Sequence, residues 1–134
     1  MSQYLLDTNI ASYVIKGNYP TVRRHLAVVP LYQVAISAVT EGELRYGVAR
    51  LPAATSLKAI VEEFLTRVVI HPWDSAAAKE YGRIRAALEQ TGDALGNLDT
   101  MIAAQALATG STLVTHDKAF SRVKGLEIQD WTKA

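Results

Sequence analysis

The sequence predicts an α/β fold: a short, mostly parallel central sheet flanked by helices on both sides. Short apolar runs of strand length alternate along the chain with stretches of helical pattern. These runs carry apolar residues on both faces, as strands do in a parallel sheet that helices cover on both sides. No linker, repeat or low-complexity run interrupts the 134 residues, so we expect a single domain over 1–134.

The first third of the chain opens with a strand and two helices. A short apolar run over 4–6 predicts a buried strand. A helix over 9–16 follows, because Gly17 is a typical residue at which a helix stops. Pro20 is tolerated in a first helical turn, so a second helix is expected over 20–28.

The middle of the chain continues the alternation. Residues 34–36 form the second expected strand, and a helix over 37–51 follows and is closed by Pro52. A further helix is expected over 54–66, because its apolar residues recur at helical spacing. That apolar face consists of Leu57, Ile60, Val61, Phe64 and Leu65.

The last half adds three strands and two helices. The third strand is expected over 68–70, and Asp74 caps a long helix that runs to Gln90. A nearly all-apolar helix over 98–108 ends at Gly110. The remaining strands are expected at 112–115 and 126–128.

Four acidic residues are expected near one edge of this sheet. Ligands of open parallel sheets bind beyond the carboxyl ends of the strands. Asp7 directly follows the first strand, Asp117 follows the fourth, and Glu43 lies early in the helix after the second. Asp99 lies in the first turn of the apolar helix, with Asn97 as the better-placed cap, and the positive helix end favours its ionised form.

Each of these positions also has a structural interpretation. Asp7 and Asp117 each precede a helical segment that they can cap. Thr40 and Glu43 fit a capping box, in which the glutamate reaches back to the threonine N–H. Helical spacing alone does not choose between Glu41 and Glu43, which flank the inward face on opposite sides.

Read together, the acids predict a metal site. Two carboxylates about 4 Å apart repel by roughly 4 kcal/mol at an effective dielectric near 20, so a cluster needs protons or a cation. All-oxygen ligation suits Mg²⁺ or Mn²⁺, and a bound ion can activate water to hydrolyse a phosphodiester. Thr8, Asn9 and Thr115 would orient the acids or water. With no cysteine, a thiol enzyme, an iron–sulfur protein and a Cys-based zinc site are excluded.

Four short motifs then carry a family resemblance. They are Asp7-Thr8-Asn9, Glu43-Leu44 with Gly47, Gly96 with Asp99 and Ile102-Ala103-Ala104, and Leu113-Val114-Thr115 with Asp117. In this order and spacing they resemble PIN-domain ribonucleases, specifically the VapC-type toxins of bacterial toxin–antitoxin pairs. The resemblance covers almost the whole chain and implies a PIN-like fold. It implies that Asp7, Glu43, Asp99 and Asp117 are the catalytic and metal-binding acids, which chooses Glu43 over Glu41.

The same resemblance implies an activity and its partners. We expect a Mg²⁺- or Mn²⁺-dependent endoribonuclease that cuts a loop of structured RNA, tRNA or rRNA, through metal-activated water. The family implies a homodimer, a cognate VapB-type antitoxin, and contact with DNA only through that antitoxin. No signal peptide and no apolar run of about 20 residues is visible, so we expect a cytoplasmic protein and no membrane partner.

The residues also leave two other functions open. A phosphatase with an aspartyl nucleophile at Asp7 would show a second acid where Asn9 stands. A Mg²⁺-binding receiver-like module would carry an acid pair ahead of the first strand, and that pair is missing. A phosphorylated Asp7 would favour either alternative, whereas metal-dependent RNA cleavage favours the nuclease.

The charge balance fits an enzyme that approaches RNA. The formal net charge of +1 excludes a strongly basic nucleic-acid coat, yet outside the four acids 14 basic residues face nine acidic ones. Tyr46 is the best candidate for stacking on a base. The candidate phosphate contacts are Arg23, Arg24, Arg45, Arg50, Arg83, Arg85, Lys118, Arg122 and Lys124.

Overall fold

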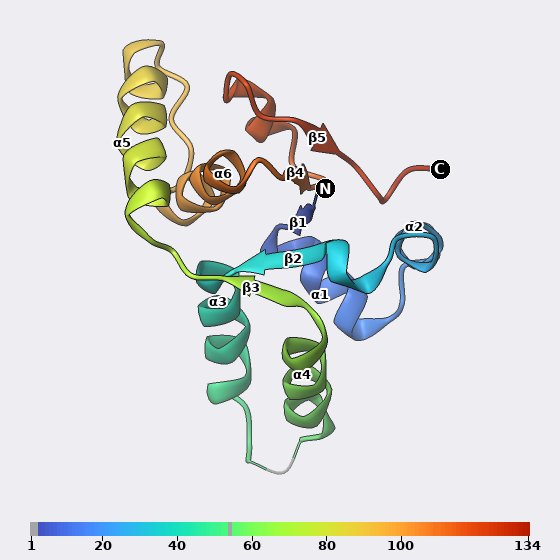
Figure 1. Cartoon of the computed structure of the whole chain (residues 1–134). Helices are drawn as coiled ribbons and strands as arrows, with labels where there is room; N and C mark the ends of the chain where they lie inside the picture. Colours follow the sequence, from blue (N-terminus) through green and yellow to red (C-terminus); the bar gives the residue numbers. More distant parts are fainter. Residues whose placement is uncertain (1–2, 54) are drawn as a thin grey trace.

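A five-stranded sheet forms the centre of the computed structural model, which describes residues 3–53 and 55–134 (Figure 1). Within those residues the strand order is β3-β2-β1-β4-β5, and every neighbouring pair is parallel. The strands are β1 (Tyr4–Leu6), β2 (Val34–Ser37), β3 (Val69–His71), β4 (Thr112–Val114) and β5 (Ile128–Gln129). The predicted parallel sheet is therefore confirmed.

Helices connect the strands. They are α1 (Thr8–Lys16), α2 (Pro20–Ala27), α3 (Ala38–Ala49), α4 (Ser56–Arg67), α5 (Ser75–Gln90) and α6 (Asn97–Thr109). Two short 3₁₀ segments, η1 (Leu31–Gln33) and η2 (Lys118–Arg122), precede β2 and follow β4. Figure 1 shows α3 and α4 extending side by side away from the sheet as a hairpin.

Helices cover both faces of the sheet, as predicted. Successive strand residues point to opposite faces, so Leu5 packs on one side and Leu6 on the other. The Leu5 side is closed by α5, α6 and Phe120 of η2. The Leu6 side is closed by α1 to α4 and by Trp131 near the end of the chain. This two-sided burial explains why the strands read as apolar runs without alternation.

Glycine and aspartate end and begin helices where the sequence places them. Gly17 and Gly110 follow α1 and α6 with φ of 66°, a left-handed conformation that glycine adopts without steric cost. Asp74 caps α5, because its carboxylate accepts a hydrogen bond from the Ala77 N–H at 3.1 Å. Residue 54, the expected first residue of α4, lies outside the described residues, and α4 begins at Ser56.

Two expected helix caps are wrong. Ser37 caps α3 by accepting from the Val39 N–H at 3.1 Å, so Thr40 lies inside the helix and forms no capping box. At α6, Asn97 is the first helical residue, and Gly96 is the cap residue without a side-chain bond. In both cases more than one residue near the helix start can serve as the cap, and the one used lies before the residue that the sequence favoured.

The strand order creates a switch point at β1. The chain runs from β1 to β2 and β3 on one side, then returns to place β4 and β5 on the other. Crevices at such switch points are the usual ligand sites of open parallel sheets. The Asp7 N–H donates to the Val114 carbonyl at 3.0 Å, which fixes the ends of β1 and β4 side by side. Among the described residues, no helix is long and apolar enough to span a membrane.

Candidate active site

Asp7 stands at the switch point and is held by two hydrogen bonds. It is 4% exposed, its Oδ1 accepts from the Ile10 N–H at 2.9 Å, and its Oδ2 accepts from the Thr115 hydroxyl at 2.5 Å. Burial raises the pKa of Asp7, and the charges of Asp99 and Asp117 raise it further against these two bonds. Asp7 is thus the N-cap of α1 and a buried acid at the site edge at once.

Thr115 links two of the candidate acids. Its hydroxyl donates to Asp7 and accepts from the Asp117 N–H at 3.0 Å, and the residue is 2% exposed. Asp117 itself is exposed and caps η2 by accepting from the Ala119 N–H at 2.9 Å. The cap interpretation of Asp117 therefore holds, while its charge also acts on both Asp7 and Asp99.

Asp99 approaches the same edge from the start of α6. It lies in the first turn of the helix and is half-buried. Burial raises the pKa of Asp99, and the charges of Asp117 and Glu43 raise it further. Asp99 therefore experiences the charge of Asp117, which follows β4, and the charge of Glu43, which lies on α3.

Glu43 is positioned by a tertiary contact rather than by its own helix. Its Oε1 accepts a hydrogen bond from the Thr8 hydroxyl at 2.6 Å, and that hydroxyl lies 3.2 Å from the Thr40 hydroxyl. Thr40 thus lies beside Glu43, although the sequence predicts a helix-capping role for it. Its place one helical turn before Glu43 is the signal that could have revealed it. Asn9 is exposed at the start of α1.

The four acids offer only oxygen ligands, the type that a hard cation takes. In the described part of the chain, every ion pair joins other acids, so no Lys, Arg or His neutralises these four. Within the same residues, no three His, Asp or Glu side chains converge closely enough to hold a metal directly. Mg²⁺ contacts one or two carboxylates and reaches others through water, so the looser arrangement still suits it.

The candidate phosphate contacts differ in their availability. Several arginines are paired with glutamates of the same or a neighbouring helix, which occupies their charge: Arg45 with Glu41 and Glu62, Arg83 with Glu80, and Arg85 with Glu89. Within 3–53 and 55–134, Arg23, Arg24 and Arg50 form no such pair.

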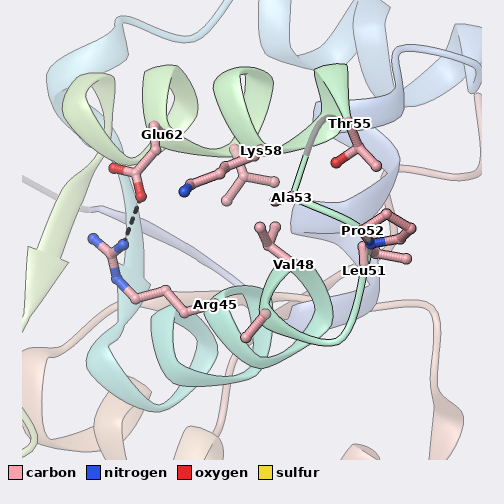
Figure 2. Close-up of a pocket in the computed structure, with 10 residues that line it drawn as sticks. Arg45, Val48, Leu51, Pro52, Ala53, Thr55, Lys58 and Glu62 are labelled. Atoms are coloured by element: carbon pink, nitrogen blue, oxygen red, sulfur yellow. Dashed lines mark hydrogen bonds and ion pairs between the residues drawn. The ribbon is translucent and has the colours of Figure 1, made fainter.

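A separate pocket of about 330 Å³ lies between α3 and α4, away from the acids (Figure 2). Its walls include Val48 and Pro52, and its rim carries Lys58 and the Arg45–Glu62 pair. Because none of the four candidate acids lines it, this pocket is not the candidate active site.

These features together define a class of protein: a small parallel α/β domain with unpaired carboxylates at its switch point. The model of the PIN domain family matches residues 4–126. The chain is similar to the "tRNA(fMet)-specific endonuclease VapC" of Shigella flexneri, with 36% identity over 98% of this chain and 100% of that protein. The chain belongs to the PIN-domain family, among its VapC members.

Solved structures agree with this membership. The DNA-bound VapBC structure from Salmonella typhimurium matches with a TM-score of 0.90 and 34% identity over 98% of this chain and 99% of that one. VapBC2 from Rickettsia felis, bound to a promoter DNA fragment, matches with a TM-score of 0.86 and 33% identity over 96% of this chain and 98% of that one. The predicted PIN-like fold is confirmed.

Proposed function

We propose that the protein is a Mg²⁺- or Mn²⁺-dependent endoribonuclease and the toxin of a toxin–antitoxin pair. The observation that carries the proposal is a set of four acids without a basic partner, in which the charges of Asp117 and Glu43 act on Asp99 and those of Asp99 and Asp117 act on Asp7. Burial and neighbouring negative charge raise the pKa values of Asp7 and Asp99 there. The names of the relatives, ribonuclease and endonuclease, support RNA as the substrate.

Asp7, Glu43, Asp99 and Asp117 would hold the ion. A bound divalent ion lowers the pKa of water and stabilises negative charge on a phosphoryl oxygen. Thr115 fixes the orientation of the Asp7 carboxylate, and Thr8 fixes that of Glu43. The Thr115 hydrogen bond lowers the pKa of Asp7, so it favours the charged form of that carboxylate that a cation needs.

The partners follow from the same family. The solved neighbours are VapBC complexes, some of them with DNA, so we propose a VapB-type antitoxin as partner and DNA contact through that antitoxin. We further propose a homodimer of single domains in the cytoplasm, where a structured tRNA or rRNA loop would be the target.

Cleavage of total bacterial RNA tests the proposal. The purified protein is incubated with RNA and Mg²⁺, Mn²⁺ or EDTA, and new 5′ ends are mapped by sequencing. We expect discrete cuts that need the metal, and at least about 100-fold slower cleavage by Asp99→Asn and by Glu43→Gln. Asp93→Asn, a change at an exposed acid between α5 and α6, is the matched control and should cleave like the parent.

Several results would contradict the proposal. Cleavage in EDTA, or full activity of both acid variants, would remove the carboxylate site from the mechanism. Hydrolysis of small phosphate monoesters, or a phosphorylated Asp7 after treatment with a phosphodonor, would point to the phosphatase or receiver alternative.

A further inference from the structure

A groove between α3 and α6 opens beside the candidate acids. This α3–α6 groove has a volume of about 730 Å³ and is lined by Val39, Glu43 and Tyr46 of α3, by Arg50 directly after that helix, and by Leu98 and Met101 of α6. Glu43 belongs both to the groove and to the acid set, and Leu98 directly precedes Asp99. The groove is therefore continuous with the site at which we propose that RNA is cut.

The groove presents an aromatic ring that the fold leaves exposed. Tyr46 is 68% exposed and Leu98 is 48% exposed, although both are large side chains with apolar surface. The Arg50 guanidinium carbon lies 5.7 Å from the centroid of the Tyr46 ring. An exposed ring with a cation over one of its faces offers a surface for an unstacked base and a charge for its phosphate.

The charge beside this ring is available. Arg45, one turn before the end of the same helix, is held by Glu41 and Glu62 at 3.0 and 2.7 Å. Arg50 forms no ion pair with any acid of the described chain. Its charge is therefore the one on this face of α3 that can meet a phosphate, next to acids that a cation would offset.

Two glycines line the groove. Gly42 and Gly47 both line it, and a Cβ added at either would meet no atom within 4 Å. Neither has a positive φ, so the backbone does not require glycine there. Glycine inside a helix costs about 0.5–1 kcal/mol relative to alanine. Both positions therefore have room for a side chain, so a larger residue there would occupy the groove.

We propose that the α3–α6 groove binds an unpaired nucleobase of the RNA, adjacent to the bond that is cut. Tyr46 stacks on the base, Arg50 binds a neighbouring phosphate, and Gly42 and Gly47 leave the space that the base occupies. The proposal rests on the proposed ribonuclease function and adds to it the feature of the RNA that is recognised: a splayed base in a single-stranded loop.

Steady-state kinetics on a short RNA that spans the mapped cleavage site test this groove. Tyr46→Ala should raise KM about tenfold, because stacking on an aromatic side chain is lost, while kcat changes less than about threefold. Tyr46→Phe keeps the ring and should stay near the parent value. Tyr32→Ala is the matched control, since Tyr32 is 55% exposed on η1 at the opposite end of β2.

Two further variants separate binding from folding. Gly47→Leu places a side chain in the groove and should raise KM without lowering the melting temperature, because the added Cβ meets no neighbouring atom and the helix loses a glycine. Arg50→Gln should raise KM and reduce the slope of log KM against log salt by about one. With 2-aminopurine placed beside the cleavage site, in EDTA, the parent should quench its fluorescence and Tyr46→Ala should not.

The outcomes separate this inference from the function on which it rests. If the parent cuts no RNA, the proposed function fails. If the parent cuts and Tyr46→Ala and Gly47→Leu keep its KM, the groove binds no base and the inference is wrong. If light scattering shows that these variants change the oligomeric state, the groove is an interface between copies of the chain, which also overturns the inference.

Discussion

Replacement of Thr115 by valine exchanges the buried hydroxyl for a methyl group of similar size. That hydroxyl donates to the Asp7 carboxylate at 2.5 Å and accepts from the Asp117 N–H at 3.0 Å. A hydrogen bond to a charged group contributes about 1.5–3 kcal/mol and a neutral one about 0.5–1.5 kcal/mol. We expect Thr115→Val to lower the free energy of unfolding by about 2–4 kcal/mol.

The change is large enough to measure by thermal unfolding. For a domain of 134 residues, 1 kcal/mol corresponds to roughly 3–4 °C, so the melting temperature should fall by about 6–16 °C at neutral pH. Thr115→Ser keeps the hydroxyl and loses one methyl group, which costs about 1 kcal/mol. The serine variant is therefore the control that separates the hydroxyl from the packing.

The pH dependence tests the reason for the loss. The Thr115 hydrogen bond lowers the pKa of Asp7, so it stabilises the ionised carboxylate. The deficit of Thr115→Val relative to the parent should therefore be largest at neutral pH and shrink in acid, where Asp7 is protonated. An equal deficit at both pH values, measured by circular dichroism, would refute the idea that Thr115 supports the charge of Asp7.

Three further predictions concern the acids. Asp7→Asn should abolish RNA cleavage. In EDTA at neutral pH this variant should melt no lower than the parent, because asparagine removes a buried charge. A lower melting temperature in differential scanning fluorimetry would contradict this. Mg²⁺ or Mn²⁺ at 100 times its Kd should stabilise the parent by about 2.7 kcal/mol, a rise of roughly 10 °C in the same assay, and Asp99→Asn should lose this rise. The raised pKa values of Asp7 and Asp99 mean that both acids bind protons more tightly when folded, so their contribution to stability is present below their ordinary pKa and is lost as pH rises through the raised values. Chemical unfolding in EDTA across this range should therefore show a smaller decline for the double variant Asp7→Asn/Asp99→Asn than for the parent.

The sequence predicted the layers of the fold because local patterns determine them. Apolar runs such as Tyr4–Leu6 and Thr112–Val114 are buried on both faces, and that requirement is visible in the residues themselves. Boundaries were less predictable where several residues can serve as a cap. Ser37 ends β2 and caps α3, so the expected helix start at 37 and the capping box at Thr40 were each displaced.

Local sequence patterns could not predict the contacts between segments that lie far apart along the chain. The Thr8 hydroxyl meets Glu43 across 35 positions, and this contact depends on how α1 packs against α3. The α3–α6 groove likewise needs two helices whose relative placement no local pattern gives. Tyr46 could be selected as an aromatic candidate from the sequence, but its exposure and the free charge of Arg50 required the structure.

The hydrogen bond from the Asp7 N–H to the Val114 carbonyl ties the reactive edge to the two innermost strands of the sheet. Amide groups in such positions exchange with solvent only when the whole domain opens, whereas peripheral hairpins such as α3–α4 open at lower cost. Asp7 would then keep its place for as long as the chain stays folded, whereas Glu43 lies on α3 and would leave with that hairpin. Local opening of α3 would therefore remove one candidate acid while the sheet edge stays intact, which gives the site a reversible route to an incomplete state short of global unfolding.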